Sequence, residues 1–276
     1  MKESEPSSKS TEKELLKVIP KVCPICKTPS VLAYGMHDPK KKQDSLWYHC
    51  QCGVAFQSEY PSHDVYDKVY TAEYIGFKEA KLRGEYAARL YAPLIEELIY
   101  SRNMLDVGFN TPYVMDYMED RGWNVWGIDI NKDTDAGGNK YKGDFLTYDF
   151  QPKPRDKAMK ELVEKGKIKR TFDLIFMSHV LEHFNDPLAA LRKCWNLIPD
   201  GGVLFIAVPD VDFIFKLSPA GFPHWTKKEH YVLWNERALR REVERIGFKV
   251  IMSRRNFSSR FISWYDVHLL AQRPYF

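Results

Sequence analysis

Short apolar runs alternate with helical patterns over the second half of the chain. The runs have the length of buried strands and are NMLDVG (103–108), NVWGIDI (124–130), TFDLIFMS (171–178) and GGVLFIAVPD (201–210). Two stretches with the apolar spacing of helices lie among them, YVMDYMEDRG (113–122) and DPLAALRKCWNLI (186–198). Strand, helix and strand in repetition are typical of a parallel sheet with helices on both faces. The pattern therefore predicts a doubly wound α/β domain at residues 101–276.

A further helix is predicted upstream of this domain. Apolar residues recur at every fourth position from about residue 78, namely Tyr86, Leu90, Leu94 and Leu98. Pro93 lies inside the stretch and is expected to kink it. We assign residues 61–100 to a linker followed by this packing helix.

The first 60 residues have a different character. Residues 1–14 are polar and charged with almost nothing to bury, which predicts a disordered lead. Residues 15–60 have little apolar mass but hold four of the five cysteines. A module of this kind is stabilised by a metal or by crosslinks rather than by a core. We therefore expect a second, small folding unit.

The cysteine spacing indicates a zinc ribbon. Cys23 and Cys26 form a CPIC pair, and Cys50 and Cys52 follow in HCQCG. Two such pairs separated by a loop are the arrangement with which a closed tetrahedral zinc site is built. The second pair is irregular, so the fourth ligand is either Cys50 or His49. Four protein ligands leave no position for a substrate, which makes the expected zinc structural.

Composition narrows the class of protein only slightly. The formal net charge of the 276-residue chain is +4, which identifies no partner by itself. No stretch approaches the roughly 18 uncharged apolar residues of a membrane span, and the first residues lack the apolar run of a signal peptide. We expect a soluble, cytoplasmic protein with no membrane partner.

The ends of the first two predicted strands indicate a nucleoside ligand. Gly108 follows the first strand, and Asp129 closes the second. In doubly wound sheets, an acid about 20 residues beyond such a glycine reaches a ribose hydroxyl of a nucleotide. A dinucleotide fits poorly, because Asn110 and Tyr113 occupy positions where its pyrophosphate calls for further glycines.

Several motifs taken in order carry a family resemblance. NMLDVGFNTPYV, NVWGIDIN, GDFL, FDLIFMSHVLEHFNDPLAALRKCWNLIPDGGVLFIAVPD and the terminal FKVIMSRRNF together resemble class I S-adenosylmethionine-dependent methyltransferases. The resemblance covers about residues 22–274 and is strongest to the group in which a Cys-rich ribbon ending in CG precedes the catalytic domain and HVLEH follows the fourth strand. It implies a mostly parallel, seven-stranded, Rossmann-like sheet. The chain departs from the family in its first loop, where Gly108, Asn110 and Pro112 stand for the usual GxGxG.

The resemblance also implies roles for individual residues. Asp106 and Gly108 would face the methionine part of S-adenosylmethionine, and Asp129 would hold the ribose diol. Asp144 and Phe145 would flank the adenine, and Ser178 would line the pocket. Asn110 and Ile130, which neighbour these positions, complete the expected cofactor site.

Three histidines are candidates for the acceptor side. His179 directly follows a predicted strand, at the sheet edge where ligands bind in such folds. His183 lies four residues later, and His230 lies in the long aromatic stretch 211–235, which we interpret as a lid. Methyl transfer requires an in-line approach of a nucleophile and one base to remove its proton. We predict that His179 or His230 is that base, with His183 as the third candidate.

Three functions follow from these features. The first is methylation of a small-molecule or sugar-like acceptor. The second is a nucleic-acid methyltransferase, in which the zinc ribbon and the basic segment 151–170 bind phosphates. The third is a non-catalytic adaptor that has lost its cofactor through the altered first loop.

Overall fold

The computed structural model describes residues 20–38, 43–61, 78–131, 138–150, 161, 171–216, 229–257 and 265–275. The expected disordered lead 1–14 lies outside these residues. So does the basic segment 151–170 apart from residue 161, and so does the middle of the expected lid, 217–228.

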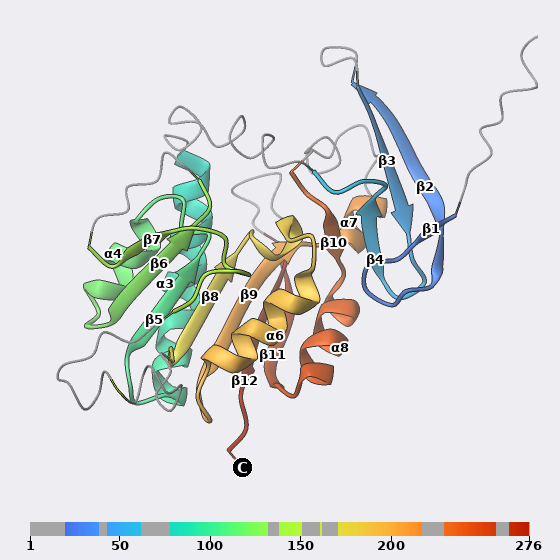
Figure 1. Ribbon diagram of the computed structural model, residues 1–276. Helices are drawn as coiled ribbons and strands as arrows, with labels where there is room; N and C mark the ends of the chain where they lie inside the picture. The colour runs from blue at the N-terminus through green and yellow to red at the C-terminus, as the bar shows by residue number, and fades with distance from the viewer. Residues whose placement is uncertain are drawn as a thin grey trace, which may run out of the picture.

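A seven-stranded sheet forms the centre of the molecule (Figure 1). Its order is β11-β12-β9-β8-β5-β6-β7. The strands are β5 (Asn103–Val107), β6 (Asn124–Asp129), β7 (Lys140–Lys142), β8 (Leu174–Ser178), β9 (Val203–Pro209), β11 (Lys249–Phe257) and β12 (Tyr265–Gln272). Pairing is parallel from β9 through β7, and β12 runs antiparallel to both β9 and β11. The predicted fold class, a mostly parallel seven-stranded Rossmann-like sheet, is confirmed.

Helices cover both faces of this sheet (Figure 1). They are α3 (Lys78–Leu98), α4 (Tyr113–Glu119), α6 (Pro187–Leu197) and α8 (Glu236–Ile246), with a 3₁₀ turn, η1, at Leu181–His183. A further helix, α7 (Val211–Lys216), follows β9 and packs through Val211 against Trp47 and Ala55. Successive strand residues point to opposite faces, so Met104 packs with α3 and α4 whereas Leu105 packs with α6 and α8. Burial of both faces explains why β8 and β9 are continuously apolar rather than alternating.

Helix α3 forms where it was predicted, with Pro93 inside it, but only part of the predicted stripe packs. Leu94 and Leu98 are half-buried against the core, whereas Tyr86 and Leu90 are exposed. The fully buried face consists of three alanines, a tyrosine and an isoleucine, namely Ala87, Ala88, Tyr91, Ala92 and Ile95. Small side chains let the helix axis approach the sheet closely, and a pattern that counts only large apolar residues misses such a face.

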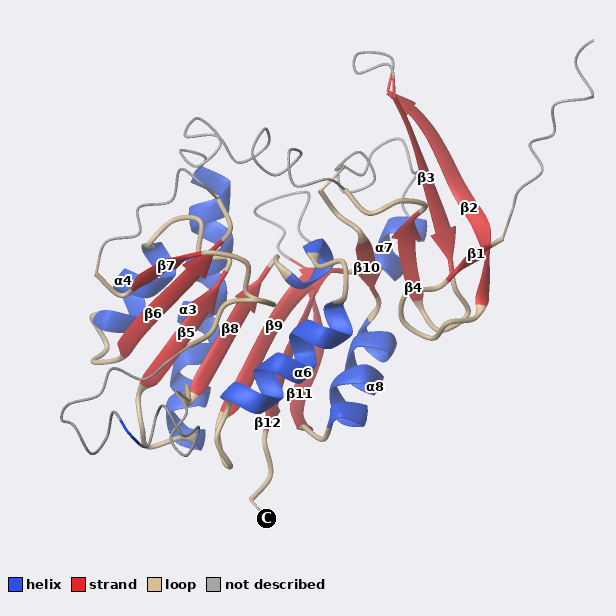
Figure 2. Cartoon of the chain, in the orientation of Figure 1, coloured by secondary structure: helices blue, strands red, loops and turns tan. Residues whose placement is uncertain are grey.

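The N-terminal module is a four-stranded sheet that a strand from the second half of the chain extends. The strands are β1 (Lys21–Val22), β2 (Pro29–Asp38), β3 (Gln43–His49) and β4 (Val54–Gln57), followed in space by β10 (Val232–Trp234). Figure 2 shows only strands and loops in this module, whereas the helices gather around the larger sheet. β10 pairs antiparallel with β4, with Leu233 opposite Ala55. The segment expected as a lid, 211–235, thus begins with α7 and ends as a strand of the N-terminal sheet.

Within the described residues, no helix is long and apolar enough to cross a bilayer.

Candidate functional site

The loop after β5 has a backbone conformation that explains its unusual sequence. Gly108 has φ 71°, and a Cβ placed there would lie 2.6 Å from Val180 Cγ2, so glycine is required. Asn110 has φ 46°, in the left-handed region that glycine and asparagine tolerate best. Asn110 therefore has a backbone conformation that a glycine at this position could also adopt.

Two buried carboxyl groups support this loop. Asp129 accepts hydrogen bonds from the backbone amides of Asn110 (2.8 Å) and Asn131 (2.7 Å). Burial raises the pKa of Asp129, against these amide hydrogen bonds, which lower it. Burial likewise raises the pKa of Asp106 well above its usual range, and the nearby Asp129 raises it further. Asp129 thus links the loop after β5 to the end of β6. Its contact with a ribose stays a prediction.

Asp144 and Phe145 lie together just beyond β7. Asp144 Oδ1 accepts the backbone N–H of Leu146 at 2.8 Å, which closes a tight turn. Phe145 is buried and packs against Phe150 and Phe184. This arrangement gives the edge of the sheet an apolar wall beside a polar turn.

The other two expected cofactor positions lie at strand ends. Ile130 directly follows β6 and is exposed, and Ser178 is the half-buried last residue of β8. Asp106, Gly108 and Asp129 likewise lie at or next to the carboxyl ends of β5 and β6, which are parallel neighbours in the same sheet as β8.

His179 lies between two buried carboxyl groups at the end of β8. Its Nε2 is 3.2 Å from Asp266 Oδ2, and its Nδ1 is 3.5 Å from Glu182 Oε1. His179 has φ 56°, which is uncommon for a residue with a side chain, and its amide donates to the carbonyl of Ala207 at 2.8 Å. Such conformations persist where the surroundings hold them and concentrate at functional sites.

A chain of polar groups, buried except for Arg254, continues behind Asp266. Arg254 Nε donates to the Tyr91 hydroxyl at 2.9 Å, and that hydroxyl lies 2.9 Å from His268 Nδ1. Because the Tyr91 oxygen accepts from Arg254, its proton points to Nδ1, which leaves the His268 Nε2 proton toward Asp266 Oδ2 at 4.0 Å. Burial lowers the pKa of His268 to about 4. The chain therefore holds Asp266 in a fixed place next to His179.

His183 and His230 lie on the other side of Glu182. His183 Nδ1 is 2.8 Å from the carbonyl of Glu229, and the His183 and His230 rings meet edge to face at 4.9 Å between centroids. The structure thus brings together all three predicted histidines around one carboxylate. Glu182 lies within the HVLEH motif, which does not indicate a role for it. Asp266 carries no local motif, and only the pairing of β12 with β9 brings it to the site.

The four cysteines form one compact group. Their sulfur atoms lie within 4.8 Å of one another, with Cys23 to Cys52 at 3.7 Å and Cys26 to Cys50 at 3.3 Å. These separations are too long for disulfides, whereas sulfurs bound to one zinc ion at about 2.3 Å in a tetrahedron lie about 3.8 Å apart. Backbone amides of Ile25 and Cys52 approach the sulfurs of Cys23 and Cys50 at 3.4 and 3.5 Å. Cys50, rather than His49, completes the group.

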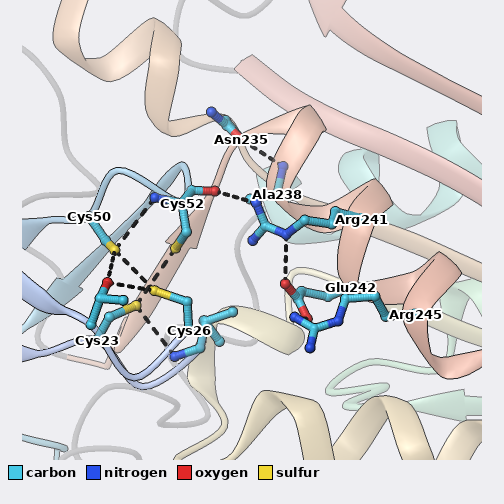
Figure 3. A network of polar contacts seen from close by, with 11 residues as sticks. Cys23, Cys26, Cys50, Cys52, Asn235, Ala238, Arg241, Glu242 and Arg245 are labelled. Atoms are coloured by element: carbon cyan, nitrogen blue, oxygen red, sulfur yellow. Dashed lines mark hydrogen bonds and ion pairs between the residues drawn. The ribbon is translucent and has the colours of Figure 1, made fainter.

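The cysteine group is attached to helix α8 (Figure 3). Arg241 Nη1 donates to the carbonyl of Cys52 at 2.9 Å, and Arg241 Nε donates to Glu242 at 2.8 Å. The amide of Asn235 donates to the carbonyl of Gly53 at 3.2 Å. The same Asn235 caps α8 by accepting the amide of Ala238 at 2.8 Å. The cysteine group and the first turn of α8 are thus joined by a continuous polar network.

Comparison with known families identifies the central domain. A family model described as a methyltransferase domain matches residues 79–253, more than half of the chain. The chain belongs to this family. The methyltransferase is S-adenosylmethionine-dependent, as the motif order in its sequence predicted.

Curated relatives of this methyltransferase are distant. The ubiquinone biosynthesis O-methyltransferase of Actinobacillus pleuropneumoniae is 25% identical over 168 residues, which are 54% of this chain and 70% of that protein. The protein of the same name from Marinobacter nauticus is 25% identical over 138 residues, 46% of this chain and 57% of that protein. The chain thus spans little more than half the length of the second relative.

Solved methyltransferase structures share the fold. The 1,6-didemethyltoxoflavin-N1-methyltransferase of Burkholderia thailandensis, solved with its substrate and S-adenosylhomocysteine, has a TM-score of 0.52 at 15% identity and covers 83% of this chain and 99% of its own. An S-adenosylmethionine-dependent methyltransferase from Thermotoga maritima has a TM-score of 0.53 at 12% identity and covers 77% of this chain and 100% of its own. At these identities the likeness concerns the fold.

Proposed function

We propose that this methyltransferase methylates a small-molecule or sugar-like acceptor, with His179 as the base that takes the acceptor proton. The observation that carries the proposal is the contact of His179 Nε2 with Asp266 at the carboxyl end of β8. The names of the relatives, ubiquinone biosynthesis O-methyltransferases, favour a hydroxyl group on a small molecule. Segment 151–170, on which the nucleic-acid hypothesis rested, lies outside the described residues apart from residue 161.

The geometry around His179 suits removal of a proton. With Nε2 directed at the Asp266 carboxylate, Nδ1 is the nitrogen that receives the proton. The carboxylates of Asp266 and Glu182 stabilise the imidazolium that forms. As His179 takes the proton, the acceptor oxygen becomes the nucleophile for in-line transfer of the methyl group. S-adenosylmethionine supplies the methyl group when bound.

The first loop offers a partner for the cofactor's ammonium group. Asn110 Oδ1 is buried and accepts no hydrogen bond. A buried acceptor without a donor costs stability, so such groups often await a ligand. The resemblance directs the methionine part of the cofactor to this loop, and its ammonium group is a donor. We therefore propose that Asn110, Gly108 and Asp106 surround the methionine end, with Asp129 at the ribose and Asp144 and Phe145 at the adenine.

Replacing Asn110 with glycine tests this placement. Glycine accepts φ 46° without strain, so Asn110→Gly removes the side-chain acceptor and leaves the loop path intact. A hydrogen bond to a charged group contributes about 1.5–3 kcal/mol, or roughly 10- to 100-fold in affinity. We expect the Kd of S-adenosylhomocysteine, measured by calorimetric titration, to rise by that factor. Asn139→Gly, at an exposed turn residue, is the matched control and should bind as the wild type does.

The acceptor class is tested by a transfer assay. We expect purified protein to move a labelled methyl group from S-adenosylmethionine to hydroxylated small molecules, phenols and sugars among them, and not to RNA or DNA. Labelling confined to nucleic acid, with binding that weakens steeply as salt rises, would overturn the proposal in favour of the nucleic-acid methyltransferase.

We further propose that Cys23, Cys26, Cys50 and Cys52 hold a structural zinc ion. The sulfur separations and the amides directed at two of the sulfurs support it. With four protein ligands, the ion has no position for substrate and contributes to folding.

A further inference from the structure

Glu182 is a carboxylate buried without hydrogen-bond donors. Its exposed fraction is 0%, and neither carboxylate oxygen has a hydrogen-bond partner. Two imidazole nitrogens approach Oε1 without bonding to it, His179 Nδ1 at 3.5 Å and His183 Nε2 at 3.9 Å. A buried charge of this kind is normally paired or bound to a metal. The described residues around Glu182 therefore place no positively charged group within hydrogen-bonding distance of its carboxylate.

The proton on His183 can be located from its contacts. His183 Nδ1 lies 2.8 Å from the backbone carbonyl of Glu229, and a carbonyl oxygen only accepts hydrogen bonds. Nδ1 therefore donates, which leaves the lone pair of the neutral ring on Nε2, the nitrogen that faces Glu182. A lone pair directed at a carboxylate is unfavourable unless a cation lies between them. Metal-binding histidines commonly donate their second N–H to a carbonyl in this way.

His230 completes a set of three ligands. Its side chain is buried, and one ring nitrogen lies within 4.8 Å of the ligand atoms of Glu182 and His183. Three ligands spread evenly around one ion, each at about 2.1 Å, lie about 3.6 Å apart. The ligand atoms therefore have to approach one another by up to about an ångström for all three to bind one ion.

The backbone holds this set in place from two sides. The amide of Tyr231 donates to the carbonyl of Glu182 at 2.8 Å, and the Gln57 side chain of β4 donates to the carbonyl of His230. η1 and the segment before β10 are thereby tied to one another and to the N-terminal sheet. Positions fixed in this way before binding favour a metal site over an adaptable surface cluster.

The set lies beside the expected reaction centre. His183 is near enough to Asp129 for the two side chains to interact electrostatically, and Glu182 adjoins His179. A cation held here would border the ribose end of the cofactor site on one side and the proposed base on the other.

We propose that Glu182, His183 and His230 bind a divalent first-row transition cation whose remaining positions take an oxygen of the acceptor. Two imidazoles and one carboxylate suit such ions and leave coordination positions open. The ion would polarise the acceptor hydroxyl and lower its pKa, so that His179 removes the proton more readily. The cation site stands on the geometry alone, whereas its role toward the acceptor rests on the proposed function.

Manganese is the probe that separates this site from the cysteine group. Protein whose zinc content is limited to one ion per chain is titrated with Mn²⁺, and the unbound ion is followed by electron paramagnetic resonance, because thiolates prefer zinc and oxygen and nitrogen ligands accept manganese. We expect one additional Mn²⁺ per chain, with nitrogen couplings from imidazole in pulsed spectra of the wild type. Glu182→Gln should weaken Mn²⁺ binding at least about tenfold. Glu244→Gln, the same change on the exposed side of α8, should leave it unchanged.

The outcomes separate the site from the function. Absence of imidazole couplings in the wild type, or unaltered Mn²⁺ affinity in a folded Glu182→Gln protein, overturns the cation site. If Glu182→Gln does not fold, the wild-type couplings decide alone. Transfer to a small acceptor at an undiminished rate by protein without a divalent ion at this site overturns the role of the cation toward the acceptor and leaves the proposed function standing. If Mn²⁺ binds at this site and the protein methylates only nucleic acid, the cation site stands and the proposed function is overturned.

Discussion

The variant His179→Asn is expected to lower kcat for methyl transfer by about 10²- to 10⁴-fold, the usual contribution of a general base. Asparagine is chosen because it tolerates φ 56° and because its amide can still donate to Asp266. It cannot accept the acceptor's proton at neutral pH. Steady-state kinetics with a defined acceptor, together with the Kd of S-adenosylhomocysteine, gives the measurement, and that Kd should stay within a few-fold of the wild type.

A second variant separates a base from a residue that only fills space. Asp266→Asn keeps the size of the side chain but removes the charge that stabilises the imidazolium, so kcat should fall while KM changes little. Activity within about threefold of the wild type for His179→Asn would eliminate His179 as the base. In that case His230 is the next candidate from the sequence.

The variant Cys50→Ser is expected to lose the zinc ion and, with it, the fold of the N-terminal sheet. Structural zinc contributes on the order of 10 kcal/mol to folding, comparable with the entire stability of an ordinary domain. Zinc content by elemental analysis should drop from about one ion per chain. Thermal unfolding should begin at a lower temperature than in the wild type.

His49→Asn is the matched control for the alternative ligand. His49 precedes Cys50 directly but lies outside the group of four sulfurs, so this variant should keep its zinc. The reverse result, with zinc retained by Cys50→Ser and lost by His49→Asn, would assign the fourth ligand to the histidine.

Sequence patterns predicted those parts of the fold that depend on local residues. The runs at 103–108, 124–130, 171–178 and 201–210 all contain strands, because a sheet covered on both faces requires continuous apolar side chains. The cysteine spacing likewise predicted a compact group. Helix α3 shows the limit of this approach, because its buried face depends on small residues that fit the sheet rather than on large apolar ones.

Contacts between distant segments could not be predicted in the same way. Asp266 lies 87 positions from His179 and carries no motif, so only the antiparallel pairing of β12 with β9 brings them together. The left-handed backbone of Asn110 is visible only in the structure, and its place in the cofactor site stays a prediction. The burial of Glu182 without hydrogen-bond donors among the described residues is likewise something that the HVLEH motif does not display.

Strand β10 makes the two parts of the protein inseparable. Val232, Leu233 and Trp234 are completely buried, and their partner strand is β4. An excised catalytic fragment would leave these three side chains and an unpaired edge in water, which invites aggregation. The N-terminal sheet is therefore an integral part of the protein, and the position of His230, just before β10, depends in part on its contact with Gln57.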